Sequence, residues 1–107
     1  MSPAGPGPCL YLTRGADRSI LCLEGPIAIL GSAPDCDLVV GADGVSRHHA
    51  VVRRGKGGYV LHDFASKRGT FVNGRRVEEH ALADGDVIRL GSASLVYAIP
   101  TMVDGSL

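Results

Sequence analysis

The chain has 107 residues, of which 45% are hydrophobic, and it carries 11 Lys and Arg against 11 Asp and Glu. This length suits one domain, which can bury about two-thirds of its unfolded surface and leaves no room for an enzyme built from two lobes. The formal net charge of zero excludes the overall positive field of a general nucleic-acid or membrane binder.

Short apolar runs separated by glycine and proline predict an all-β domain. The chain contains 15 Gly and 6 Pro, which fall at short intervals between these runs. In chain order, we expect strands at residues 9–13, 19–23, 27–30, 37–40, 50–53, 59–63, 70–72, 75–77, 87–90 and 94–99. No window holds a sustained 3.6-residue apolar period, so we expect no long helix.

Three of the connections can be assigned from their residues. Asn73 and Gly74 lie between two short strands and tolerate positive φ, which predicts a tight hairpin. The run GKGG at 55–58 joins the strands on either side of it, but it lacks the spacing and the following helix of a nucleotide-binding loop. The run DGD at 84–86 predicts a turn that leads into the strand at 87–90.

The two ends differ from the middle of the chain. Residues 1–8 are rich in Pro and Gly, and residues 101–107 are short and polar. We therefore expect a flexible segment at 1–8, a domain at 9–100 and a tail at 101–107. The start lacks the features of a signal peptide, and no apolar run approaches the roughly 18 residues that span a bilayer.

The cysteines Cys9, Cys22 and Cys36 are odd in number, widely spaced and set among apolar residues. This pattern indicates neither a disulfide framework nor a CxxC metal site. We therefore expect buried, reduced thiols, and a reducing cytoplasmic location fits them best.

The four histidines are residue types that could ligate a metal. No cysteine or carboxylate joins His48, His49, His62 or His80 at a recognised zinc spacing. We therefore expect structural or solvated histidines, with no metal and no cofactor.

The neutral total conceals two regions of opposite charge. Residues 46–76 contain eight basic residues and one acid, Asp63, which gives +7. The rest of the chain contains three arginines and ten acids, which gives −7. The +7 region is the best argument for nucleic-acid binding, but its few aromatic residues provide a poor stacking platform, so we expect no nucleic-acid partner.

Four short motifs follow one another in the middle of the chain. They are GSAPDCD at 31–37, SRHH at 46–49, DFASKRGTFVNG at 63–74 and DGDVIRLG at 84–91. In this order and spacing, they resemble the forkhead-associated (FHA) domain over about 90 of the 107 residues. The resemblance implies a β-sandwich of about eleven strands, with loops at one end that bind a phosphothreonine-containing peptide. A phosphothreonine carries about −1.5 to −2 charges and three acceptor oxygens, so its reader needs hydrogen-bond donors and cations.

The same resemblance assigns roles to individual residues. Phosphopeptide binding is implied for Ser46, Arg47, Lys67, Arg68 and Ser32. Structural support of the binding loops is implied for Gly31, His49, Gly69, Thr70, Asn73 and Gly74. Among these, Ser46 matches the serine that bonds phosphate, and His49 matches a histidine that braces the loops without touching ligand.

Two positions depart from the family pattern. Ser32 replaces the arginine that is a principal phosphate contact, and Arg68 replaces the asparagine that bonds the peptide backbone. The loss of one charged hydrogen bond, about 1.5–3 kcal/mol, weakens binding about 10-fold to 100-fold unless another group restores it, and Arg68 is the obvious candidate. The alternative is a degenerate FHA domain that binds protein partners, or itself, without phosphate.

A catalytic function is not expected. Ser46, His49 and Asp63 are the residue types of a hydrolase triad, but no nucleophile elbow accompanies them. The sequence therefore predicts a non-catalytic protein-interaction module with no membrane association, whose oligomeric state stays open.

Overall fold

The strands alternate between buried and exposed side chains, as two sheets packed face to face require. In the computed structural model, which describes residues 7–14 and 17–100, Ile88 and Leu90 are buried while Val87 and Arg89 are exposed. The strands are β1 (Cys9–Arg14), β2 (Asp17–Cys22), β3 (Ile27–Gly31), β4 (Leu38–Val39), β5 (Ala50–Arg54), β6 (Tyr59–Asp63), β7 (Thr70–Val72), β8 (Arg75–Val77), β9 (Glu79–Ala81), β10 (Val87–Leu90) and β11 (Ala93–Ala98).

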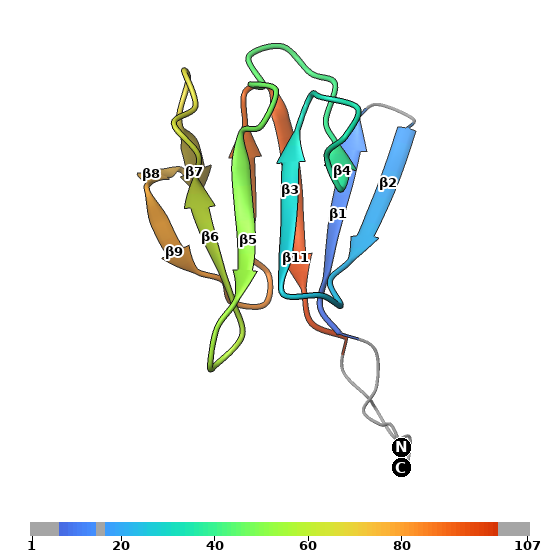
Figure 1. Cartoon of the computed structure of the whole chain (residues 1–107), viewed down its shortest axis with the longest axis vertical. Coiled ribbons are helices and arrows are strands. Elements are labelled where there is room, and N and C mark those ends of the chain that lie inside the picture. The colour runs from blue at the N-terminus through green and yellow to red at the C-terminus, as the bar shows by residue number, and fades with distance from the viewer. Residues whose placement is uncertain (1–6, 15–16, 101–107) are drawn as a thin grey trace.

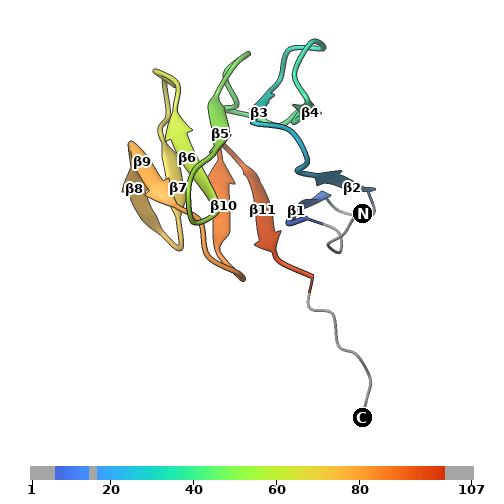
Figure 2. The ribbon, with the colours of Figure 1, turned by 60° about the horizontal axis from the view of Figure 1, so that its bottom comes forward.

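The eleven strands form two sheets that lie one over the other (Figures 1 and 2). One sheet has the order β2-β1-β11-β10-β7-β8 and the other the order β4-β3-β5-β6-β9. The described residues contain no helix, and hence no helix long and apolar enough to cross a membrane. The expected all-β sandwich of about eleven strands is therefore confirmed.

The core lies between the two sheets. One sheet contributes Leu10, Leu95 and Ile88, and the other contributes Leu30 and Leu61, all with no exposed surface. Burial of such side chains is the main favourable term in folding, at about 25 cal/mol per Å² of apolar surface. The loops are therefore carried by a well-packed scaffold.

Each of the ten expected strands is present, and one further strand was missed. The missed strand, β9, has the residues Glu-His-Ala, which show no apolar alternation. It forms because β6 offers it an unpaired edge, with His80 opposite Leu61. The segments expected at the two ends of the chain, residues 1–8 and 101–107, fall largely or wholly outside the described residues.

The expected turns have the backbone conformations that their residues favour. Asn73 and Gly74 have φ of 51° and 86°, and they close the hairpin between β7 and β8. In the 84–86 run, the amide of Asp86 donates to the carbonyl of Ala83 across 3.0 Å, so a turn precedes β10.

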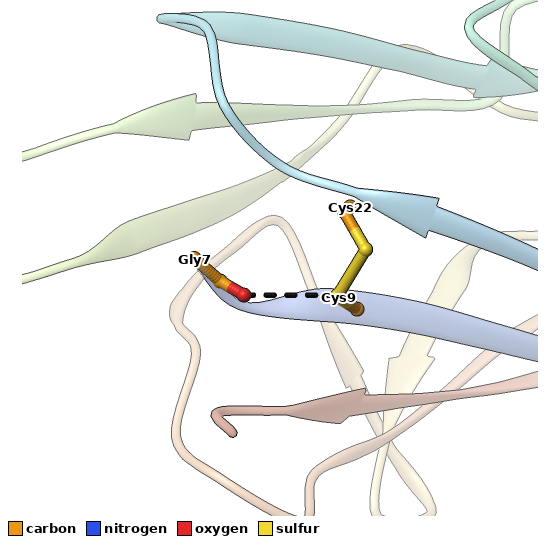
Figure 3. Close-up of a disulfide and its surroundings, with 3 residues drawn as sticks. All are labelled: Gly7, Cys9 and Cys22. Atoms are coloured by element: carbon orange, nitrogen blue, oxygen red, sulfur yellow. Dashed lines mark hydrogen bonds between the residues drawn. A yellow bond between two sulfur atoms is a disulfide. The ribbon is translucent and has the colours of Figure 1, made fainter. Parts of the chain in front are cut away.

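The expectation of three reduced thiols was wrong for two of the cysteines. Cys9 and Cys22 are joined by a disulfide between β1 and β2 (Figure 3), while Cys36 is free and buried. The physical reason is strand register, since the antiparallel pairing of β1 with β2 places Cys9 directly opposite Cys22. Their separation of 13 positions does not reveal this pairing.

We expect the unfolded, unreduced chain to titrate one free thiol, from Cys36, and the reduced chain to titrate three. A thiol assay in denaturant checks this, and Cys36→Ser is the control, with no free thiol before reduction and two after it. Because the disulfide closes a short loop, its loss should lower the free energy of unfolding by about 2–3 kcal/mol. Three titratable thiols before reduction would contradict the disulfide.

The topology gathers three loops at one end of the sandwich. Figure 1 shows the β3–β4, β4–β5 and β6–β7 loops together there, with the β5–β6 turn at the opposite end. The antiparallel register of β5 and β6 pairs Ala50 with Asp63, so the loop that enters β5 lies beside the loop that leaves β6.

Candidate functional site

A hydrogen bond between Ser46 and Lys67 joins the β4–β5 and β6–β7 loops, which carry the sequence motifs at 46–49 and 63–74. Ser46 and Lys67 are separated by 21 positions, yet the amide of Lys67 donates to Ser46 Oγ across 3.3 Å. Ser46 Oγ keeps its own O–H as a donor, so it can still bind an acceptor. The structure thus brings together the two loops that the sequence analysis singled out.

A hollow of about 600 Å³ lies between these two loops. Its lining residues are Gly44, Val45, Ser46, Arg47, Ala65, Lys67 and Arg68. Three of them are cationic, one has a hydroxyl and none is acidic. This composition favours a small, doubly charged anion with several acceptor oxygens.

His49 connects the two loops from below. It has no exposed surface, its Nδ1 accepts the Ser46 amide across 3.0 Å, and its Nε2 lies 2.9 Å from the Gly69 carbonyl. Because Nδ1 accepts, Nε2 carries the proton and donates to that carbonyl. One buried ring therefore sets the distance between the loops.

The β3–β4 loop packs against the back of the β4–β5 loop. The amide of Ser32 donates to the Ser46 carbonyl across 3.0 Å, and Ser32 does not line the hollow. Gly31 passes so close that a Cβ on it would overlap the carbonyl oxygen of Arg47. Glycine is therefore required at position 31 for the two loops to approach.

The β6–β7 loop is held by a half-buried carboxylate, that of Asp63. Asp63 accepts hydrogen bonds from the hydroxyls of Ser66 and Thr70, the latter across 2.7 Å, and Ser66 Oγ accepts the Gly69 amide across 2.9 Å. Gly69 has φ of 88°, a conformation that favours glycine. Burial acts to raise the pKa of Asp63, but the hydrogen bonds from Ser66 and Thr70 outweigh it and hold the pKa below its ordinary value.

This lowered pKa makes the loop sensitive to acid. A carboxyl whose folded pKa is depressed stabilises the fold above its unfolded pKa of about 4, and the contribution is lost as pH falls through the folded pKa. We expect Asp63→Asn to lower the free energy of unfolding at pH 7 and to flatten its decline below about pH 4. Urea denaturation between pH 7 and pH 2.5, about the range over which Asp titrates, checks this. Glu79→Gln is the exposed control, and an unchanged acid profile for Asp63→Asn would contradict the expectation.

Asn73 and Gly74 lie one short strand away from the hollow. Asn73 donates to Asp86 across 2.9 Å and accepts from the Val87 amide across 3.0 Å. The pair therefore stabilises the β7–β8 turn and the start of β10. Thr70, by contrast, reaches the β6–β7 loop through Asp63.

The fold divides the basic region of the sequence. Arg47, Lys67 and Arg68 line the hollow, whereas Lys56 lies in the β5–β6 turn at the opposite end of the sandwich (Figure 1). Arg76, on β8, lies beside Gly69, where a Cβ would come within 3.3 Å of its side chain. Only three of the eight basic residues therefore contribute to the lining.

Arg68 lies between the first hollow and a second of about 520 Å³. The second is lined by Asp43, Arg68, Phe71, Gly74, Arg89, Gly91 and Ser92. The side chain of Arg68 runs beside Gly44, whose added Cβ would lie 3.7 Å from Arg68 Cγ. The Arg68 guanidinium can therefore bind an anion in the first hollow while the aliphatic part of the side chain lies over the Gly44 backbone.

The lining residues Gly44, Val45 and Ala65 were not expected from the sequence. Gly44 and Val45 lie outside the four motifs, and Ala65 lies within the 63–74 motif but has no charged or polar side chain to mark it. Ala65 also takes φ of 52°, which its residue type does not predict. They line the hollow together with the charged groups because the two loops that carry them are held side by side. Only the contacts between loops could have identified them.

Comparison with known proteins finds related domains and similar folds. The family model of the FHA domain matches residues 28–91. The ABC transporter ATP-binding/permease protein Rv1747 of Mycobacterium tuberculosis is 44% identical over 73 residues, which are 68% of this chain, and FhaA of the same organism is 39% identical over 93 residues, or 87% of it. This chain spans 8% and 18% of the lengths of those two proteins. A solved structure from work on phosphothreonine-dependent FHA domain interactions superposes with a TM-score of 0.82 at 33% identity and covers 90% of this chain and 99% of that one.

Proposed function

The chain belongs to the FHA domain family, and from this premise we propose that it is a non-catalytic module that binds phosphothreonine-containing peptides in the hollow between its β4–β5 and β6–β7 loops. The observation that carries the proposal is the lining of that hollow, which combines the Ser46 hydroxyl with three cations and no acid. A dianionic phosphate needs such a set of donors. The similarity to a domain studied for phosphothreonine-dependent interactions supports the same ligand.

Within this proposal, each site residue has a role that follows from its position. Ser46 and Arg47 contact the phosphate from one loop, while Lys67 and Arg68 contact it from the other. Ser32 acts through its backbone, because its amide holds the Ser46 carbonyl. His49 holds the two loops at their separation by hydrogen bonding to both, whereas Asn73 and Gly74 support the β7–β8 turn.

Calorimetric titration tests the proposal directly. An oriented phosphothreonine peptide library is titrated into the full chain beside its unphosphorylated twin. We expect heat of binding only with the phosphorylated library, and we expect free phosphothreonine at high concentration to compete. Equal binding of the two libraries would show instead that this is a degenerate FHA domain, which binds protein partners without phosphate.

The departures at positions 32 and 68 give a second test of the same hollow. The double variant Ser32→Arg with Arg68→Asn should bind the phosphopeptide about tenfold more tightly, because one added charged hydrogen bond is worth about 1.5 kcal/mol or more. Arg68→Asn alone is the control and should bind more weakly than the unmodified chain. If the double variant gains nothing, Arg68 already performs the task that we assign to an arginine at 32.

We also propose a cytoplasmic location, where kinases that use ATP produce phosphothreonine. The cysteines do not support this location, since Cys9 and Cys22 are joined by a disulfide. Disulfides are rare in reducing compartments, so the state of this bond in cells is informative. A reducing cytoplasm would open the bond that the isolated chain contains, so rapid alkylation of thiols in intact cells should trap Cys9 and Cys22 as free thiols. Complete protection of both would place the domain in an oxidising compartment.

A further inference from the structure

The β3–β4 loop brings a carboxylate and a thiol to an imidazole on the β4–β5 loop. One ligand atom each from Asp35, Cys36 and His48 lies within 4.8 Å of the other two. His48 Nε2 is 3.0 Å from Asp35 Oδ1. We propose that these three residues bind a zinc ion.

The three donors match the coordination chemistry of zinc. Zinc takes thiolate at about 2.3 Å, imidazole at about 2.0–2.1 Å and carboxylate at about 2.0–2.2 Å, so donors around a tetrahedral ion lie about 3.4–3.8 Å apart. The three groups therefore need to move inward by little more than 1 Å. Three protein ligands leave the fourth position for water, and the soft thiolate disfavours Mg²⁺ and Ca²⁺.

The burial of the three residues suits a site that an ion enters from one side. Cys36 is buried, the His48 side chain is 38% exposed and that of Asp35 is 73% exposed. The buried sulfur forms the floor of the site, and the imidazole and carboxylate form its open edge. An ion can reach the sulfur by displacing the contact between Asp35 and His48.

Zinc binding requires one proton to leave the site. Cys36 Sγ now donates to the Arg47 carbonyl across 3.1 Å, so the sulfur carries a proton. When the sulfur binds zinc as thiolate, its proton passes to solvent and the S–H bond is replaced by an S–Zn bond. The neutral His48 ring binds zinc through the lone pair of one nitrogen and keeps its single proton on the other, so the ring releases none. The Arg47 carbonyl keeps the hydrogen bond from the Ala33 amide, at 3.1 Å, and is not left unsatisfied.

The site adjoins the proposed phosphopeptide hollow without sharing a residue with it. His48 follows Arg47 directly in the chain, so a zinc ion on His48 and Cys36 would tie the β3–β4 loop to the loop that carries Arg47. The inference goes beyond the proposed function and rests only on the Asp35, Cys36 and His48 cluster. Absence of phosphopeptide binding would leave it standing.

Titration with Co²⁺ and Zn²⁺ tests the site in the full chain with its disulfide intact. Co²⁺ should bind at a one-to-one ratio and produce a thiolate-to-cobalt charge-transfer band, which Zn²⁺ then removes by displacement. Zinc binding should release one thiol proton per chain, as measured in a weakly buffered solution with a pH indicator. No charge-transfer band at a Co²⁺ excess would overturn the proposal.

Matched variants identify the ligands. Cys36→Ser keeps a donor for the Arg47 carbonyl but removes the thiolate, and His48→Gln removes the imidazole from a partly exposed position. Each should weaken zinc binding at least about 10-fold to 100-fold, the loss seen even for residues that only support a metal ligand. His62→Gln, which alters a histidine near Glu79, is the control and should bind zinc normally.

The outcome of these variants decides the proposal even if one of them folds poorly. Thermal melting without metal shows whether each variant is folded, and His48→Gln alone suffices if Cys36→Ser is not. Unchanged zinc affinity in a folded variant would show adventitious binding elsewhere and overturn the site. Phosphopeptide calorimetry on the metal-free chain is read separately, so failure of one proposal is distinguishable from failure of the other.

Discussion

Replacing His49 with alanine is expected to lower both the stability of the domain and its affinity for phosphopeptide. The ring has no exposed surface, and it hydrogen bonds both to the Ser46 amide on one loop and to the Gly69 carbonyl on the other. Its removal leaves two backbone groups without their partner, at about 1–3 kcal/mol each, beside a cavity. We expect the free energy of unfolding to fall by about 3 kcal/mol.

Thermal and urea denaturation measure the first effect, and calorimetry measures the second. A loss of about 3 kcal/mol corresponds to a decrease in Tm of about 12–20 °C for a domain of this size. The control is His62→Ala, which removes a partly exposed ring whose nearest carboxylate lies 3.8 Å away. That variant should lose less than about 1 kcal/mol, as exposed ion pairs do. A His49→Ala chain that loses binding at unchanged stability would place His49 in contact with the ligand.

Replacing Arg47 with alanine is expected to weaken phosphopeptide binding about 10-fold to 100-fold at nearly unchanged stability. Arg47 is exposed and lines the hollow, and a charged hydrogen bond contributes about 1.5–3 kcal/mol. Its side chain is the one cation that the β4–β5 loop contributes to the lining. The contacts of Arg47 with the β3–β4 loop are made by its backbone carbonyl, which lies against Gly31 and accepts from the Ala33 amide, and alanine keeps that carbonyl.

Calorimetry with one phosphothreonine peptide compares this variant with Arg53→Ala. Arg53 belongs to the same basic region of the sequence but lies on β5, outside the lining of the hollow. If the site reads phosphate locally, only Arg47→Ala changes the affinity. Equal losses for the two arginines would indicate that general positive charge, and not the hollow, attracts the peptide.

The strands and turns could be predicted because their signals are local. Alternation along residues 87–90 and the Asn73 and Gly74 pair act over a few positions, and the folded chain retains both. β9 could not be predicted, because its three residues show no apolar alternation and they form a strand only by pairing with the edge of β6. The ordered motifs likewise identified the binding loops, because each loop is a contiguous stretch of sequence.

The candidate site was predicted only in part. Ser46, Arg47, Lys67 and Arg68 line the hollow as a group, whereas Ser32 does not reach it. Distance along the chain carries no information about which side chain points into a cavity. The position of Ser32 follows from a backbone hydrogen bond to Ser46, and every residue type can form such a bond.

The sequence by itself therefore determined the fold class, the turns and the family, since these follow from short-range patterns of apolar, turn and motif residues. Only the tertiary structure decided which distant residues share a surface. Strand register joined Cys9 to Cys22, and loop packing brought Asp35 and Cys36 to His48. The fold also placed the charges of the +7 region at both ends of the sandwich, because two charged residues that are close in the sequence can lie at opposite ends of a strand. Zero net charge thus conceals one small cationic hollow, built by two loops that the antiparallel β5 and β6 hold side by side.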